Sequence, residues 1–288
     1  MNDQQGVRAR VCSKLFGTGE VTMRFRCLTS FLIICACTSL SAAQDSISRV
    51  LVRDSRGLEV LRHAVESGGG VQAIAAFRSY SAFGDITFFW TEAGTDGDVT
   101  LKARWPGQFR MDIHLSDGTE QWVFIKHGAG FKKEVNGETR PLLYQEVVNL
   151  QSYCFPLEQL VRALQNSDIE VGYGGTATRE GRLTFVVRVQ TAPGFPASKD
   201  TRRKLSEKKY YIDARTYKIV SVEDFAYPRR WIADGIRRRI VFSDYRQVQG
   251  AWLPFSISEI AGKDRRLLTI RLNEASINVP LSDSDFEP

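Results

Sequence analysis

The chain has 288 residues, and its 39 Lys and Arg against 33 Asp and Glu give a formal net charge of +6. Residues 1–43 hold five of these basic and two of these acidic residues, so the rest carries 34 minus 31, or +3, an excess too small to indicate nucleic-acid binding. Four of the five Cys residues also precede residue 44, which leaves Cys154 alone and excludes an intramolecular disulfide in the remainder.

The first feature along the chain is an export signal. Arg24 and Arg26 give a basic start, and Leu28 to Cys37 form an apolar run that is too short to span a bilayer. Ser41-Ala42-Ala43 is a small-residue cleavage site. We therefore predict that residues 1–43 are an N-terminal extension and secretory signal peptide, cleaved after Ala43, and that the mature chain is periplasmic or secreted.

Lipid attachment is the alternative interpretation of the same segment. Ile34-Cys35-Ala36-Cys37 loosely resembles the site at which bacterial lipoproteins are cut before a Cys. In that case the protein would be a lipoprotein anchored to a membrane through Cys37.

Two short helices are predicted next. Within Ser55 to Glu66, apolar residues fall three and four positions apart, the spacing of one apolar helix face, at Leu58, Leu61 and Val65. Gly68-Gly69-Gly70 ends this helix, and Val71 to Phe77 forms a second one. Both helices precede the first strand, which is expected near Tyr80.

Between Asp85 and Ile277 the chain reads as a series of short strands. Apolar and polar residues alternate, and the breaks fall on Gly, Asp, Asn or Pro, as in the turns of an antiparallel sheet. About ten or eleven strands are predicted, among them Val99–Arg104, Phe109–Leu115, Gln121–Lys126, Phe131–Val135, Ile169–Tyr173, Leu183–Val189, Lys208–Asp213, Lys218–Phe225, Arg237–Arg246, Trp252–Ile260 and Leu267–Ser276.

One segment departs from this pattern. From Leu142 to Leu164 the apolar residues return to helical spacing, interrupted at Pro156, which predicts a helical insert. Residues 44–288 show no linker and no fixed repeat, so we predict a single domain. Its class is mainly β (α+β): a strongly curved antiparallel sheet, which must either close or have its open side covered. We expect helices to cover its concave side.

The apolar residues of the strands indicate a second apolar space. Ile86 to Trp90 and Gln121 to Ile125 carry apolar side chains at both odd and even positions, so one face cannot bury them all. The surplus faces either the underside of the helices or a ligand cavity, and core packing is the simpler explanation for any single residue. The candidate cavity residues are Phe88, Trp90, Leu101, Phe109, Met111, Ile113, Trp122 and Phe124.

The sequence predicts no catalytic residue, metal or cofactor. The three histidines fall on a helix, a strand and a turn without ligand spacing, at His63, His114 and His127. Ser116 and Ser243 each precede an Asp, but neither has the glycines of a nucleophile elbow. An enzyme would require a polar group such as His114 or Glu223 to converge with others in a pocket, and we expect no enzyme.

Charged groups on the strands are interpreted as solvent-exposed. Neighbouring strand residues point to opposite faces, so Glu223-Asp224 cannot act on one bond and is expected to be exposed. The basic runs Arg229-Arg230 and Arg237-Arg238-Arg239 are also expected on a solvated face. Contact with an anionic membrane surface is the alternative for these arginines.

Several weak motifs follow one another in a definite order between Leu58 and Phe286. They are the Gly-rich helix end, the strand Gly97–Pro106 followed by Phe109, Ser116-Asp117-Gly118 with Trp122, the helical insert, Ile212-Asp213 leading to Ile219, Phe242-Ser243-Asp244-Tyr245, and Val279-Pro280-Leu281 with Phe286. In this order and spacing they resemble the bacterial outer-membrane lipoprotein-sorting carriers, the LolA/LolB-like group.

That resemblance implies a half-open barrel whose apolar concave side, capped by helices, takes acyl chains. In this group a basic residue before Pro at a strand end helps to govern lipoprotein release, and Arg104 stands nearest that position, although Trp105 intervenes. The implied function is a periplasmic carrier or binding protein for lipoproteins or lipids. We expect a monomer that exchanges its cargo with a donor or acceptor protein of the inner or outer membrane.

The same fold also fits a different function. A non-catalytic envelope module for protein interaction or stress sensing would need no ligand cavity. That alternative predicts a filled core and an apolar patch on the surface, whereas a cavity lined by apolar side chains favours the carrier.

Overall fold

The structure is a computed structural model, and it describes residues 52–89, 94–105, 107–134, 136–150, 152–153, 156–191, 206–226 and 235–287. These residues belong to one compact unit, Val50–Pro288. Several predictions fall outside the described residues: those on the export signal, Cys37, Trp90, Cys154, Arg229 and Arg230. In the described part, no helix is long and apolar enough to span a membrane.

The helical segments are α1 (Ser55–Ser67), α2 (Gly70–Ala75), α3 (Tyr144–Leu150), α4 (Pro156–Gln165) and the 3-10 helix η1 (Asp283–Phe286). The strands are β1 (Ser79–Phe88), β2 (Thr95–Arg104), β3 (Gln108–Leu115), β4 (Glu120–Lys126), β5 (Ala129–Lys133), β6 (Thr139–Pro141), β7 (Ile169–Arg179), β8 (Arg182–Thr191), β9 (Lys208–Asp213), β10 (Ile219–Ala226), β11 (Ile236–Val248), β12 (Ala251–Ala261) and β13 (Arg265–Ile277). The predicted N-terminal helices and helical insert are therefore present.

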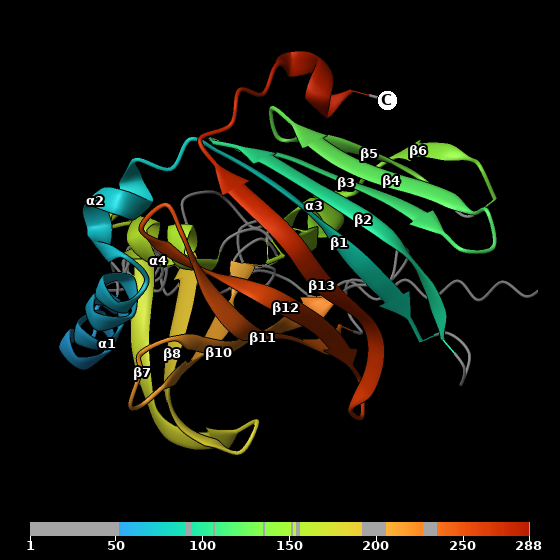
Figure 1. The fold of residues 1–288 in the computed structure, drawn as a ribbon. Helices are drawn as coiled ribbons and strands as arrows, with labels where there is room; N and C mark the ends of the chain where they lie inside the picture. The colour runs from blue at the N-terminus through green and yellow to red at the C-terminus, as the bar shows by residue number, and fades with distance from the viewer. Residues whose placement is uncertain are drawn as a thin grey trace, which may run out of the picture. The chain divides into compact units, whose positions relative to one another are not determined.

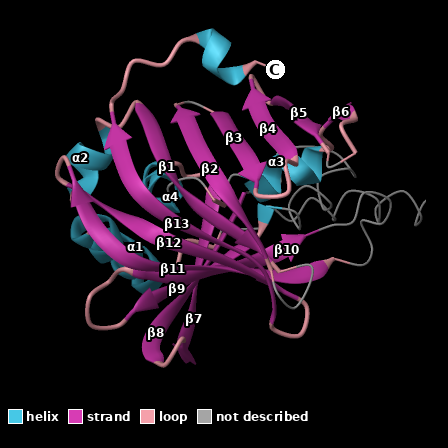
Figure 2. Cartoon of the chain, turned by 45° about the vertical axis from the view of Figure 1, so that its right-hand side comes forward, coloured by secondary structure: helices cyan, strands magenta, loops and turns pink. Residues whose placement is uncertain are grey.

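All thirteen described strands form one antiparallel sheet in the order β6-β5-β4-β3-β2-β1-β13-β12-β11-β10-β9-β8-β7. Two meanders, β1–β6 and β7–β13, are joined where β1 pairs with β13 (Figures 1 and 2). The sheet does not close, which confirms the predicted half-open barrel. The expected ten or eleven strands were too few, partly because β6 has only three residues.

The sheet has one face that the helices cover and one that is mostly open to solvent. On β2, Val99, Leu101 and Ala103 are buried and alternate with more exposed residues. Cross-strand pairing places Leu101 beside Ala82 and Met111, so the buried face continues across the strands. We call the face that carries Leu101 the concave face and the opposite one the convex face.

Helices α1 and α4 cover the β7–β8 end of the concave face (Figure 1). Asp54 caps α1, because its carboxylate accepts a hydrogen bond of 2.8 Å from the Gly57 N–H. Leu61 and Leu160 are fully buried between these helices and the sheet. Helix α4 begins at Pro156 rather than being interrupted there, because the first turn of a helix does not need the N–H that proline lacks.

The helical insert crosses the open side of the barrel as a consequence of the strand order. It connects β6, at one edge of the sheet, with β7, at the other. The shortest route between two edges of a curved sheet runs across its concave side. Helix α3 consequently lies beneath β3–β5 and α4 beneath β7, which confirms that helices cover the concave side.

The junction of the two meanders gives a stability prediction. Gly84 lies at a bulge in the β1–β13 pairing, and a Cβ atom there would be 2.1 Å from the Arg271 carbonyl oxygen. We expect Gly84→Ala to lower the free energy of unfolding by about 1–3 kcal/mol in urea denaturation, since backbone must move. Gly172→Ala on β7 is the control, because its Cβ would meet only the Arg188 side chain at 3.7 Å. Equal stabilities of the two variants would contradict this account of the junction.

Candidate functional site

An apolar pocket of about 270 Å³ lies between the concave face and α3. Its sheet wall includes Met111, Ile113 and Val123, with Leu268 from β13. The residues flanking and ending α3 close the other side, among them Leu142, Leu150 and Tyr153. Six of the fourteen lining residues are polar or charged, among them Lys132, Glu146 and Arg238, but most of the exposed wall is apolar, as in a site for an apolar ligand.

The size of this pocket limits what it holds in the closed structure. Typical sites for small ligands have about 300–1,000 Å³, so this pocket is slightly below that range. A methylene group is about the size of a water molecule, which occupies about 30 Å³, so the pocket holds on the order of nine methylene groups. It therefore fits a segment of one acyl chain, and several chains would require α3 to move.

An ion pair holds the start of α3 against the sheet. The Arg140 guanidinium donates to both carboxylate oxygens of Glu146, at 2.8 and 2.6 Å, and to Glu134 at 2.6 Å. Burial raises the pKa of Glu146. Hydrogen bonds from Arg140 and from the Leu143 N–H lower it by a larger amount, so the pKa of Glu146 lies below its usual range. Glu146 therefore remains ionised at neutral pH, and we call the Arg140–Glu146 pair the first clamp.

The other end of α3 is hydrogen-bonded to a buried ion pair of the sheet, between Arg238 on β11 and Asp224 on β10. The Arg238 guanidinium donates to the two carboxylate oxygens of Asp224, at 2.8 and 2.7 Å, and to the Asn149 carbonyl oxygen at 2.9 Å. Ser152 donates to Asp224 at 2.9 Å. Burial raises the pKa of Asp224 and the Arg238 charge lowers it, with the net result below the usual range. We call Arg238, Asp224 and Ser152 the second clamp.

Glu259 adds a third carboxyl group beside the second clamp. It lies on the concave face of β12, is 8% exposed, and pairs across the strands with Ile240 and Leu268. Burial raises its pKa to about 7. The Arg238 Nη1 lies 3.9 Å from the Glu259 Oε1, but this guanidinium is already bound to Asp224 and offsets the burial only weakly.

These buried charges correct the expectation of a solvated face. Glu223, Asp224 and Arg238 are all buried, and only the flanking Arg237 projects into solvent from this part of the pattern. The two acidic neighbours do point to opposite faces: Asp224 meets Arg238, whereas Glu223 lies near Lys209 and Arg237 at 3.9 and 3.8 Å. The alternation along β11 could have predicted that Arg238 is buried, because Arg238 lies an even number of residues from the buried Ile240 and Phe242 and therefore on the same face.

The predicted cavity residues divide into two groups. Leu101, Phe109, Met111 and Ile113 are buried on the concave face, and Met111 and Ile113 line the pocket. Phe88, at the end of β1, is half-buried against the same core. Five of the eight candidates therefore lie on the expected face, although Leu101 and Phe109 fill the core rather than the pocket.

Trp122, Phe124 and Arg104 lie elsewhere. Trp122 borders the pocket, but its ring stacks on Phe124 with centroids 5.6 Å apart, and Phe124 pairs across the strands with Arg110 on the convex face. Phe124 is buried by its own neighbours there, including Phe131. Arg104 also projects from the convex face and donates to the Leu281 carbonyl oxygen at 2.9 Å. A gating role for Arg104 inside the cavity therefore has no geometric basis.

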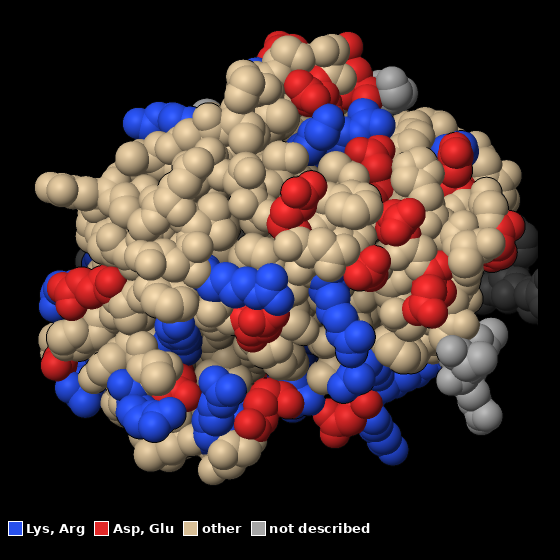
Figure 3. Space-filling view, in the orientation of Figure 1, with Lys and Arg blue, Asp and Glu red and all other residues tan. Residues whose placement is uncertain are grey.

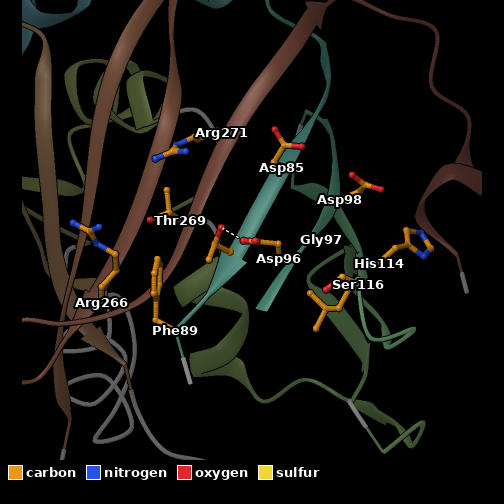
Figure 4. Close-up of a pocket in the computed structure, with 12 residues that line it drawn as sticks. Asp85, Phe89, Asp96, Gly97, Asp98, His114, Ser116, Arg266, Thr269 and Arg271 are labelled. Atoms are coloured by element: carbon orange, nitrogen blue, oxygen red, sulfur yellow. Dashed lines mark hydrogen bonds between the residues drawn. The ribbon is translucent and has the colours of Figure 1, made fainter. Parts of the chain in front are cut away.

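A larger groove of about 660 Å³ lies on the convex face, across β13, β1, β2 and β3 (Figure 4). A row of four paired positions crosses it, Arg271, Asp85, Asp98 and His114. Arg271 lies at one end of this row beside Asp85. At the other end His114 is exposed, with its Nδ1 3.7 Å from a Glu120 carboxylate oxygen. Among the described residues no group of three His, Cys, Asp or Glu is arranged to hold a metal. We therefore interpret this groove as a solvated sheet face.

Comparisons with known proteins bear on the fold. A structure described as an outer membrane lipoprotein-sorting protein domain, from Vibrio parahaemolyticus, has a TM-score of 0.51 at 12% identity, over 81% of this chain and 96% of that chain. A LolA superfamily protein from Nitrosomonas europaea has a TM-score of 0.51 at 9% identity, over 80% and 97%. No protein-family model and no curated protein matches the sequence. The chain therefore has the LolA-type fold, and identities this low say nothing more.

The buried carboxyl group beside the second clamp makes stability depend on pH. Because the pKa of Glu259 is about 7 in the folded chain and about 4.5 when exposed, the folded state binds the extra proton, and stability falls as pH rises between these values. We expect Glu259→Gln to raise the free energy of unfolding at alkaline pH, by about 3 kcal/mol at most, and to change little at acid pH. Chemical denaturation across pH measures this difference.

The exposed Glu274 on β13 provides the matched control. Glu274→Gln should leave the dependence of stability on pH unchanged. A Glu259→Gln variant with the same dependence as the unmodified protein would show that Glu259 stays ionised in the fold.

Proposed function

We propose that the protein is an exported carrier or binding protein for lipids or acylated proteins, and that it holds an acyl chain segment in the pocket beneath α3. The observation that carries the proposal is an apolar pocket roofed by a short helix that polar contacts hold at both ends. The LolA-type fold and the predicted export signal support it. The site calls for no cofactor.

The energetics indicate that the lid takes part in binding. At about 0.8 kcal/mol per buried methylene, roughly nine methylenes contribute about 7 kcal/mol. Association itself costs an estimated 4–15 kcal/mol, so the closed pocket alone gives weak binding. A longer chain binds tightly only when it displaces α3 from the sheet and buries further methylenes on the concave face.

The clamps are suited to such a movement. Lifting α3 separates Arg140 from Glu146 and lets water reach their charges. Arg238 and Asp224 lie on adjacent strands and stay paired, and they lose only the Asn149 carbonyl and Ser152 contacts. Arg140 and Lys132 hold Glu146 from the sheet side, with the Lys132 Nζ 3.8 Å from its carboxylate. Lifting α3 therefore opens a path from the rim of the sheet near β5 and β6 into the pocket.

One observation favours the alternative of a protein-interaction or stress-sensing module. The concave core is almost filled, because buried residues from Val60 to Ile277 form a single cluster in the described part of the chain, and the pocket beneath α3 is small. On the convex face, the Phe131 side chain is 40% exposed beside the Phe124 ring, with centroids 5.7 Å apart. A protein partner on this surface would need no ligand in the pocket.

Titration with a homologous series of straight-chain fatty acids tests the carrier. We expect affinity to rise about fourfold per methylene while each added group is buried, and to continue rising beyond roughly nine methylenes only if α3 opens. Calorimetry or displacement of a fluorescent acyl probe measures the series. Affinities that do not depend on chain length would contradict burial of the chain.

A pocket-filling substitution localises the binding. Val123 is only partly buried and lines the pocket, so Val123→Trp should occupy the space of the ligand and weaken the acyl probe at least about tenfold. His114→Trp adds the same ring to an exposed position on the convex face of the adjacent strand and should leave binding unchanged. If both variants bind as the unmodified protein does, the acyl chain lies elsewhere.

A further inference from the structure

The segment after β13 folds back across the convex face of the sheet, on the side opposite the pocket (Figures 1 and 2). The Val279 carbonyl oxygen accepts a hydrogen bond of 2.5 Å from Ser79, which starts this crossing. Helix η1 follows, with Ser282 and Asp285 forming a capping box. We call residues 279–287 the strap.

Four basic side chains from three adjacent strands bind the strap. On β2, Lys102 contacts Asp285 at 2.8 Å, and Arg104 pairs with Asp283. On β4, Lys126 contacts Glu287 at 2.6 Å. On β3, Arg110 donates to the Glu287 carbonyl oxygen. Acidic and basic atoms accordingly meet where the strap crosses the sheet, at the top of Figure 3.

An aromatic residue anchors the strap between these charges. Phe286 is completely buried, yet it is not part of the concave core cluster. The Arg104 guanidinium lies over its ring, 5.4 Å from the centroid. The Lys102 contact lowers the pKa of Asp285 to about 2, so this carboxylate is ionised at neutral pH. The convex face thus recognises three carboxylates and one aromatic ring in a fixed spacing.

The strap is attached in a way that permits exchange. The Asp283 and Glu287 side chains are 61% and 54% exposed, and exposed ion pairs contribute little each. Phe286 is the one strap residue that is fully buried. Release of the strap from the sheet therefore depends mainly on the contacts of this aromatic ring. A competing segment with the same chemistry meets a preformed arrangement of cations, which stays in place because regular strands carry it.

We propose that the convex face of β2–β4 is a docking surface for an acidic peptide segment of a partner protein that carries an aromatic anchor, and that the strap occupies this surface in cis. The charge complementarity between the four basic side chains and the strap identifies the chemistry of the partner. The surface lies on the reverse side of strands that line the pocket, so the two sites are distinct. The proposal is independent of acyl binding.

A labelled peptide with the sequence of residues 279–287 tests the proposal on the full chain. In the intact protein the tethered strap competes at an effective concentration on the order of millimolar, so the peptide should bind weakly. The release variant Asp283→Asn/Asp285→Asn/Phe286→Ala frees the surface and should bind the peptide at least about tenfold more tightly in fluorescence anisotropy. Added salt should weaken this binding.

Two further variants locate the site and test the role of the charges. In the release background, Lys102→Glu should weaken the peptide roughly tenfold, because it replaces attraction by repulsion. Lys133→Glu is the matched control, since Lys133 shares the convex face but lies 3.5 Å from Glu120 instead of contacting the strap. A peptide with Phe286 replaced by Ala should bind the release variant no better than a scrambled peptide.

The outcome does not depend on one variant remaining folded. Asp283→Asn/Asp285→Asn keeps Phe286 and provides a second, milder release, and circular dichroism checks both variants for a cooperative melting transition. If the folded release variants bind the peptide no more tightly than the intact protein, or if Lys102→Glu and Lys133→Glu behave alike, the proposal is wrong.

Discussion

The helical insert must connect the two edges of one open sheet, and the rest of the structure follows from this constraint. Strands β1–β6 run from the middle of the sheet to one edge, and β7–β13 return from the other edge to the middle. The connection between β6 and β7 therefore has to cross the concave side. It covers apolar strands that would otherwise be exposed, and it places α3 over the pocket.

Polar contacts at both ends, together with the buried Val147, fix the position of α3. A buried ion pair seldom adds much net stability, because desolvation offsets the attraction, but breaking one leaves an unpaired buried charge. The Arg140–Glu146 pair and the hydrogen bond from Arg238 to the Asn149 carbonyl oxygen consequently favour one position of the helix over its neighbours without making the lid permanent. Such an arrangement suits a roof that must close over the pocket and still open for a chain.

The sequence predicted the general architecture because period-two alternation and helical spacing are strong local signals. It placed Leu101, Phe109, Met111 and Ile113 correctly on the concave face. It did not separate Trp122 and Phe124 from them, because apolar residues of both parities occur on β4 and only the cross-strand register shows which face is which. Arg238 and Asp224 were misplaced because a charged run resembles a solvated face until its partners, distant in sequence, are known.

The central claim is that an acyl chain lies between the concave face and α3, and photo-cross-linking tests it most directly. A straight-chain fatty acid with a photoactivatable terminal group is bound to the protein and irradiated, and the modified residues are mapped by mass spectrometry. The account predicts modification of Met111, Ile113, Val123 and Leu150. Modification confined to the convex surface around Phe124 and Phe131, or none above that of unfolded protein, would contradict it.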